Sequence, residues 1–369
     1  MFLSMLMNKR ALIGWNKKPV FEGDRSSLAR WVISVLTILL LIAMVASLSI
    51  GPAGVTFVDF ISYMKAIFTE NEVSDRNRLI IETIRMPRLI MGILIGAALA
   101  VCGAVMQGLF RNPLADPGIV GVSSGAGLGA VSMIVLGGTL FAPLTDILGV
   151  FTLPVAAFLG ALIVTLVLYR LSTSNGETSI AMLLLGGIAI AALAAALTGI
   201  LIYLADDQQL RDLTFWGLGS LAGATWIKSI SIGPIIILCL ICTPFLAKGL
   251  NALALGEAAA HHVGIPIQKF KTMAIVMVAA ATGAAVAVSG GIGFVGIIAP
   301  HTLRLLMGPD NKYLLPASAL LGATFLTICD VICRTIAAPS ELPIGIITAL
   351  IGAPFFLWIL MSRRGFVGE

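Results

Sequence analysis

Two apolar runs joined by a short polar corner constrain this chain more than any other feature of it. Residues 85–129 read RMPRLIMGILIGAALAVCGAVMQGLFRNPLADPGIVGVSSGAGLG, and the corner is residues 111–118. The runs are rich in Gly, Ala and Ser, which let helices approach closely where no water drives them together. The segment therefore predicts a helical hairpin inside a membrane, with a corner too specific to be only a connector.

The composition excludes a soluble domain. Of the 369 residues, 59% are hydrophobic and 11% are charged, whereas globular domains carry about a quarter charged residues. A spanning helix needs about 20 mostly apolar residues. Ten candidate spans follow: 31–50, 88–109, 118–140, 149–169, 180–204, 230–247, 273–291, 294–308, 314–334 and 343–361. The eighth is short and rich in glycine, so hydropathy alone supports nine.

These spans predict an all-α polytopic membrane protein with about ten transmembrane helices. Little sequence lies between them, and none of it resembles a separate soluble domain. We expect one membrane domain over residues 28–364, a cytoplasmic leader at 1–27 and a short tail at 365–369.

An internal repeat relates two of the spans. GAALAVCG at 96–103 and GAAVAVSG at 283–290 are separated by 187 residues, and the same offset carries Pro113 onto Pro300. The second and seventh spans cross in opposite directions, so the pair predicts an inverted repeat, which is common in transporters. Chance similarity between helices rich in Gly and Ala is the alternative.

The lysines and arginines predict the orientation. With ten spans and both ends inside, fifteen of the 23 basic residues face the cytoplasm and eight face outward, so we expect both termini in the cytoplasm. Residues 31–50 form a longer apolar run than the roughly 7–15 residues of a signal peptide, which favours a retained span. The net charge of +5 reflects this topology and predicts no nucleic-acid partner.

No cofactor or metal site is expected. The five cysteines lie in apolar runs, and the Cys239–Cys242 CxxC lacks a second pair or a histidine cluster, which favours packing over metal or redox chemistry. His261 and His262 are adjacent and point in different directions on a helix. No catalytic combination of Ser, His and Asp lies in the spans, which argues against an intramembrane enzyme.

Five blocks, in this order, carry a family resemblance. They are RMPR at 85–88, GAALAVCGAVMQGLFRNPLADPGIVGVSSGAG at 96–127, LALGEAAAHHVGI at 253–265, SGGIGFVGIIAPHTLRLL at 289–306 and SELPIGIITALIGAPFFLWIL at 340–360. With them the chain resembles the FecCD family, the permeases of ATP-driven (type II ABC) importers for iron-siderophores, haem and cobalamin. The resemblance runs from about residue 28 to residue 364.

The resemblance implies a permease of the bacterial inner membrane. Its implied partners are a second copy of the chain, two ATPase subunits and a periplasmic substrate-binding protein. The segment RDLTFWGLGSLAGATW at 211–226 is most similar to haem permeases and implies haem as the transported ligand. A ferric siderophore or cobalamin is the alternative within the family.

A different class of protein, an ion-coupled secondary carrier, would also explain the repeat. Asp330 is the one acidic residue within the predicted spans, and Arg334 follows it at helical spacing. So few intramembrane acids weigh against proton coupling.

The family's docking arginines map onto Arg85, Arg88 and Arg334. By resemblance they meet acidic residues of the binding protein, and a guanidinium suits this role because it holds a carboxylate with two hydrogen bonds. Anchoring of the helix ends at the membrane interface is the alternative reading, and for Arg334 so is a pair with Asp330.

The chain has no G-x-x-x-x-G-K-[ST] loop, so it has no Walker A site and is not expected to be an enzyme. A separate ATPase would then dock on a cytoplasmic helix. The segment after the sixth span is a strong helix former that ends at Gly264 and Pro266. The resemblance makes it the coupling segment, with Gly256, Glu257, Ala258, Ala259, His261, His262 and Gly264 as its residues. An ordinary amphipathic loop is the alternative.

Thr178 and Ser179 stand before the fifth span. The resemblance to cobalamin permeases implies that they narrow the cytoplasmic exit of the transport path. Capping of the following helix is the alternative, and the two roles are compatible.

Overall fold

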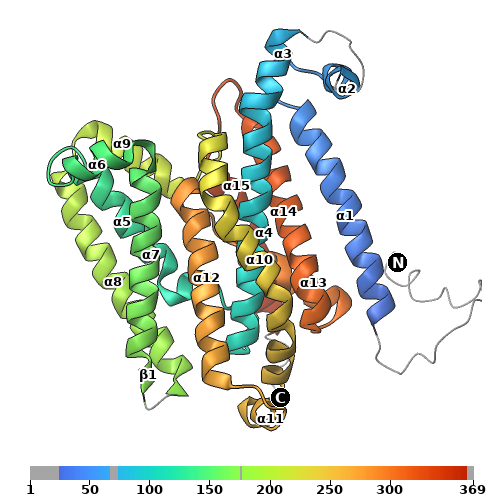
Figure 1. The fold of residues 1–369 in the computed structure, drawn as a ribbon, viewed down its shortest axis with the longest axis vertical. Coiled ribbons are helices and arrows are strands. Elements are labelled where there is room, and N and C mark those ends of the chain that lie inside the picture. Colours follow the sequence, from blue (N-terminus) through green and yellow to red (C-terminus); the bar gives the residue numbers. More distant parts are fainter. Residues whose placement is uncertain (1–24, 67–73, 175–176, 364–369) are drawn as a thin grey trace, which may run out of the picture.

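Long, roughly parallel helices form the molecule (Figure 1). The computed structural model describes residues 25–66, 74–174 and 177–363, and every structural statement below concerns those residues. The predicted leader lies almost wholly outside them, as does the tail at 365–369.

The helices are α1 (Ser26–Ser49), α2 (Phe57–Ala66), α3 (Asp75–Leu79), α4 (Met86–Phe110), α5 (Val122–Leu136), α6 (Ala142–Leu148), α7 (Thr152–Leu171), α8 (Ile180–Leu204), α9 (Asp207–Leu218), α10 (Trp226–Ala254), α11 (Glu257–His262), α12 (Ile267–Ser289), α13 (Val295–Met307), α14 (Asn311–Ile336) and α15 (Ile344–Arg363). The π-helix η1 (Ile80–Arg85) leads into α4, and η2 (Pro117–Val120) and η3 (Gly149–Phe151) are 3-10 turns. Strands β1 (Thr173–Ser174) and β2 (Glu177–Thr178) pair antiparallel.

Ten apolar helical stretches occupy the ten predicted spans, which confirms the fold class. In the described part of the chain, seven are long and apolar enough to cross a membrane, and α5, α13 and Ile344–Ile359 of α15 are shorter. The expectation that only the eighth span is short was therefore incomplete. α5 and α13 are short because irregular backbone at 111–121 and 290–294 precedes them, and such backbone is tolerated at membrane depth only where protein covers it.

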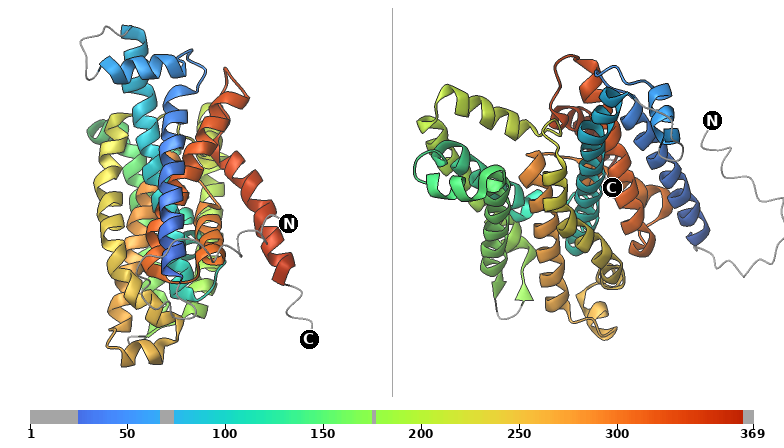
Figure 2. Two further views of the ribbon diagram at one scale, coloured as in Figure 1. Left: turned by 90° about the vertical axis from the view of Figure 1, so that its right-hand side faces the viewer. Right: turned by 45° about the horizontal axis from the view of Figure 1, so that its top comes forward.

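α4 is the central helix (Figures 1 and 2). It packs against α14, α10, α13 and α12, and 83% of its most apolar window is buried. Glycines allow this packing: a Cβ at Gly96 would lie 2.4 Å from the Gly322 carbonyl oxygen, and one at Gly103 would lie 1.9 Å from that of Gly296. The helix backbones are thus in direct contact, as expected for helices packed in lipid.

The two similar segments run in opposite directions, as predicted. α4 starts at the end of the molecule that carries α2 and α3, which we call the α3 end. α12 starts beside α11 at the opposite end, which we call the α11 end (Figure 1).

The π-helix η1 runs directly into α4. At this junction the Met86 N–H bonds the Ile81 carbonyl in the wider π pattern, and Pro87, the next residue, has no N–H to donate.

We predict that Gly103→Val destabilises the protein, because the added side chain cannot fit against the Gly296 backbone. The expected loss is at least the roughly 1–3 kcal/mol typical of overpacked cores. Thermal unfolding in detergent measures it. Gly127→Val on α5 is the control, since nothing lies within 4 Å of a Cβ there. Equal loss in the two variants would contradict the packing argument.

Candidate functional site

A buried network of charges lies at the α3 end of the molecule. Arg88 Nε is 2.9 Å from Asp330 Oδ1 on α14, and Arg88 Nη1 is 2.8 Å from both carboxylate oxygens of Glu341. Arg334 Nε lies 3.3 Å from the other oxygen of Asp330, one helical turn away. The network therefore ties α4 to α14 and to the loop that precedes α15.

Arg85 belongs to the same region but contacts backbone oxygens. It donates to the carbonyls of Leu48 in the last turn of α1 and of Val55 beyond that helix, and Arg334 Nη2 donates to the Ser47 carbonyl at 2.8 Å. Together with Asp330 and Glu341, the three arginines leave a net charge of +1 at this position.

The three predicted docking arginines are thus brought together, but they are buried. Their exposed fractions are 2% for Arg85, 6% for Arg88 and 3% for Arg334. The pair between Arg334 and Asp330 is present, as the alternative reading expected. A partner carboxylate can reach these guanidinium groups only if the residues over them move, so the docking role stays a prediction. Arg76 and Arg78 on α3 are exposed at the same end.

The predicted coupling segment forms a separate short helix, α11, at the opposite end of the molecule (Figure 1). Gly256 (φ 110°) and Gly264 (φ 84°) bound it with backbone conformations that favour glycine. Ala260 is fully buried and anchors the helix, while Glu257 pairs with Lys271 of α12 at 2.9 Å. His261 and His262 are exposed.

Two large apolar side chains flank α11 and face outward. Leu255 is 81% exposed and Val263 is 73% exposed. Because the buried Ala260 holds the helix in place, Leu255 and Val263 form an exposed apolar surface on an ordered helix, which we call the apolar knob.

The predicted gate residues lie beside the β1–β2 hairpin. The Thr178 hydroxyl donates to Gln268 Oε1 of α12 at 3.0 Å and lies 3.1 Å from the Thr173 hydroxyl. The Ser179 hydroxyl accepts the Met182 N–H and caps α8. The capping alternative is therefore observed for Ser179, and Thr178 links the hairpin to α12.

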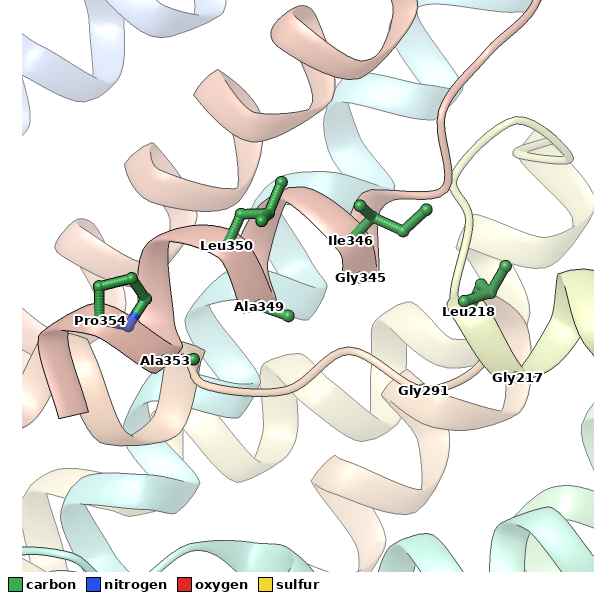
Figure 3. Close-up of a pocket in the computed structure, with 9 residues that line it drawn as sticks. All are labelled: Gly217, Leu218, Gly291, Gly345, Ile346, Ala349, Leu350, Ala353 and Pro354. Atoms are coloured by element: carbon green, nitrogen blue, oxygen red, sulfur yellow. The ribbon is translucent and has the colours of Figure 1, made fainter. Parts of the chain in front are cut away.

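An apolar cleft of about 560 Å³ lies between the end of α9 and α15 (Figure 3). The backbones of three segments meet there: the Ile344 N–H donates to the Gly219 carbonyl at 3.0 Å, and a Cβ at Gly345 would lie 2.2 Å from the Leu218 carbonyl oxygen. The lining carries no charge and consists of Gly217, Leu218, Gly291, Gly345, Ile346, Ala349, Leu350, Ala353 and Pro354. The cleft can therefore hold a bulky apolar molecule, since sites of this size take drug-sized ligands.

The sequence analysis missed one intramembrane acid, Asp116. The corner returns into the protein beside Leu99, in the middle of α4, so Asp116 lies at the depth of the spans although it precedes one in sequence. Hydropathy places the corner outside the spans because it scores sequence windows and not re-entrant backbone. The Pro113 to Pro117 spacing with an acid before the second proline is the signal that could have drawn attention to it.

Cys239 and Cys242 are free thiols, one half-buried and one exposed. Among the described residues, no three His, Cys, Asp or Glu side chains come together as a metal site.

Comparisons with known proteins agree on one family. The sequence profile of the FecCD transport family matches residues 39–362. The hemin transport system permease HmuU of Yersinia pestis is 40% identical over 335 residues, 91% of this chain and 96% of that protein. The cobalamin import permease BtuC of Halobacterium salinarum is 43% identical over 292 residues, which are 79% of this chain and 76% of that protein. A solved inward-facing ABC transporter of the metal-chelate type has a TM-score of 0.78 and is 31% identical. The match covers 90% of this chain and 99% of the chain in that structure.

We predict that Asp330→Ala strongly destabilises the protein. The change leaves Arg334 without a carboxylate partner and removes one of the two carboxylates that pair with Arg88. Breaking a buried ion pair costs about 3–5 kcal/mol. Arg78→Ala is the control: its pair with Glu82 is exposed and contributes no more than about 1 kcal/mol. Unfolding midpoints in detergent compare them, and similar small shifts would show that the network is not structural.

Proposed function

Because the chain belongs to the FecCD transport family, we propose that, as the permease of an ABC importer, it moves haem across the bacterial inner membrane. A permease of this kind has no ATPase site itself and works with ATPase and substrate-binding partners. ATP hydrolysis is thus supplied in trans. With ten passes, the two ends of the chain share one side, which we assign to the cytoplasm together with α11.

The apolar cleft is the observation that supports haem. Its wall includes Gly217 and Leu218, which belong to the segment 211–226 that most resembles haem permeases. An uncharged apolar wall suits a large planar ligand, and no charged side chain in the lining fixes that ligand in one position. A relative named as a hemin permease matches nearly the whole chain, although cobalamin permeases match at similar identity.

A second copy of the chain accounts for the exposed apolar faces of α8 and α15. Only 11% of the most apolar window of α8 is buried, and Leu350 and Leu357 of α15 are exposed. In the homodimer that we propose, these faces meet lipid or the second copy, and the conduit runs between the two protomers. Thr178 and Ser179 would narrow its cytoplasmic exit.

We assign ATPase docking to α11 with its flanking residues. The segment from Gly256 to Gly264 protrudes at one end of the molecule, where Ala260 and the Glu257–Lys271 pair hold it to the bundle while Leu255 and Val263 on its flanks stay exposed. A protruding apolar helix of this kind fits a cleft on a partner protein.

We predict that the double change Leu255→Asp and Val263→Asp abolishes co-purification of the ATPase, because it places two charges in an apolar contact. The chain should still insert and stay monodisperse, since both side chains are exposed. Val58→Asp on α2 is the matched control, being 69% exposed at the opposite end. Normal ATPase recovery with the double variant would remove the coupling role.

We also propose that the α3 end receives the substrate-binding protein, through Arg85, Arg88 and Arg334. The net positive charge of the cluster suits an acidic partner surface. Its burial implies that docking displaces the Glu341 carboxylate, which is 31% exposed and is the outermost acid of the network.

We predict that Arg85→Gln with Arg88→Gln weakens the affinity for the binding protein, most at low salt where charge attraction is least screened. Glutamine avoids the like-charge repulsion that glutamate would suffer beside Asp330 and Glu341. Surface plasmon resonance on detergent-purified permease and ATPase measures the affinity, at a temperature below the unfolding midpoint of the variant, because Arg88→Gln also removes the ion pairs with Asp330 and Glu341. Arg76→Gln with Arg78→Gln is the comparison. If only the change of the exposed pair weakens the affinity, the docking site lies on α3 and not at the buried arginines.

Vesicles containing permease, ATPase and the cognate binding protein should take up haem only with ATP. Ala353→Glu should abolish the uptake by placing a carboxylate in the cleft, while Ala353→Ser should preserve it, because serine adds no charge. Uptake of cobalamin or a ferric siderophore in place of haem would overturn the ligand and leave the family assignment intact.

A further inference from the structure

The polar corner has a defined shape that no part of the proposed transport role uses. Arg111 ends α4 in the left-handed conformation (φ 49°), and the Asn112 N–H returns to the Gln107 carbonyl at 3.2 Å. The Asp116 Oδ1 atom accepts the Gly118 N–H at 2.8 Å, which starts η2. This pattern holds the Asp116 carboxyl in one orientation.

The second oxygen of Asp116 points toward the protein interior. A Cβ at Gly296 would lie 3.1 Å from Asp116 Oδ2 and 3.0 Å from the Leu99 carbonyl oxygen, so the carboxyl sits where α4 and α13 come closest. Any side chain at Gly296 would displace it. The close contact of these helices thus makes the space that the carboxyl occupies.

A small cavity of about 20 Å³ adjoins this carboxyl. Space of this size holds one water molecule. The Thr282 side chain of α12 lines the same cavity and is 2% exposed, and among the described residues its hydroxyl has no hydrogen bond of good geometry, the polar group beside it being the weakly bonding Cys102 thiol. The Asp116 carboxyl and the Thr282 hydroxyl, from separate elements, therefore face one water-sized space, which Ser123 of α5 also lines.

The surroundings provide no positive charge. In the described chain Asp116 makes no ion pair, and the Cys102 thiol of α4 is the titratable group that contacts Thr282. α13 contributes Gly296, and α5 contributes the hydroxyl of Ser123. The Arg304 guanidinium on α13 donates instead to the Ala104 carbonyl at 3.3 Å. An ionised carboxylate without a cation at membrane depth is strongly disfavoured, whereas a neutral carboxylic acid is not.

We propose that Asp116 is a proton-binding site inside the membrane, where its neutral carboxyl and the Thr282 hydroxyl share one water molecule and so join the re-entrant corner to α12. The protonated carboxyl oxygen, Oδ2, donates a hydrogen bond to the water and keeps its proton, and the water donates a hydrogen bond to the Thr282 oxygen. Oδ1 remains the acceptor for Gly118. The link couples α4, α5 and α12 through a hydrogen-bonded chain without a net charge.

Infrared difference spectroscopy of the purified permease with its ATPase tests the site. Subtracting the spectrum of Asp116→Asn from that of the wild type at pH 7 should leave the carbonyl stretch of one protonated carboxyl, and Thr282→Val should shift that band because the shared water loses its acceptor. The absence of such a band, with a carboxylate band in its place, would overturn the proposal.

Transport and stability provide the second measurement. Asp116→Asn should retain uptake, because its amide stays neutral and its oxygen still accepts the Gly118 N–H, whereas Asp116→Ala should lose the turn and lower the unfolding midpoint. The wild-type midpoint should be the same in sodium chloride and in choline chloride. A midpoint that rises with sodium, and only when Asp116 is present, would show a small cation in place of the proton and refute the proposal.

Discussion

Direct backbone contact between α4 and its neighbours is the constraint on which the rest of this structure depends. Lipid is as apolar as the helix surfaces, so helices in a membrane associate through close packing and hydrogen bonds rather than through the hydrophobic effect. Gly96 against Gly322 and Gly103 against Gly296 bring α14 and α13 onto α4 with no side chain between them. Gly125 against Gly160 does the same for α5 and α7.

This packing places the charged groups of the bundle. Because α14 lies directly on α4, Asp330 reaches Arg88 at one end of the pair, and the loop before α15 adds Glu341. Further along α4, the close approach of α13 leaves just enough room for the Asp116 carboxyl. α4 therefore carries a paired charge toward one end, and an acid of the following corner lies without an ion pair beside its middle. The first is stabilised by a salt-bridge network, and for the second we propose a bound proton.

The surfaces left outside this core differ from one another. α8 and α15 expose long apolar faces that suit lipid or a second protomer, and the apolar cleft lies where α15 meets the end of α9. α11 is short and protrudes, with Leu255 and Val263 exposed on its flanks and Ala260 buried beneath it. In the function that we propose, this arrangement separates three tasks: passage along the cleft, ATPase contact at the α11 end and binding-protein contact at the α3 end.

The sequence by itself determined the class of fold, the positions of the ten apolar helices, the family and the absence of a nucleotide loop, because these depend on local composition and on residue order. It also predicted the position of α11 and the opposite directions of the two repeat segments.

Only the tertiary structure decided which polar groups are buried together. Arg85, Arg88 and Arg334 look like surface groups in a hydropathy profile, yet all three are buried: Arg88 and Arg334 pair with Asp330, and Arg85 donates to the Leu48 and Val55 carbonyls. Asp116 lies outside every apolar window, yet the corner folds back to the middle of α4. Contacts between segments as distant as Arg88 and Glu341 follow from how glycine-lined helices stack in three dimensions, and no local pattern in the chain records them.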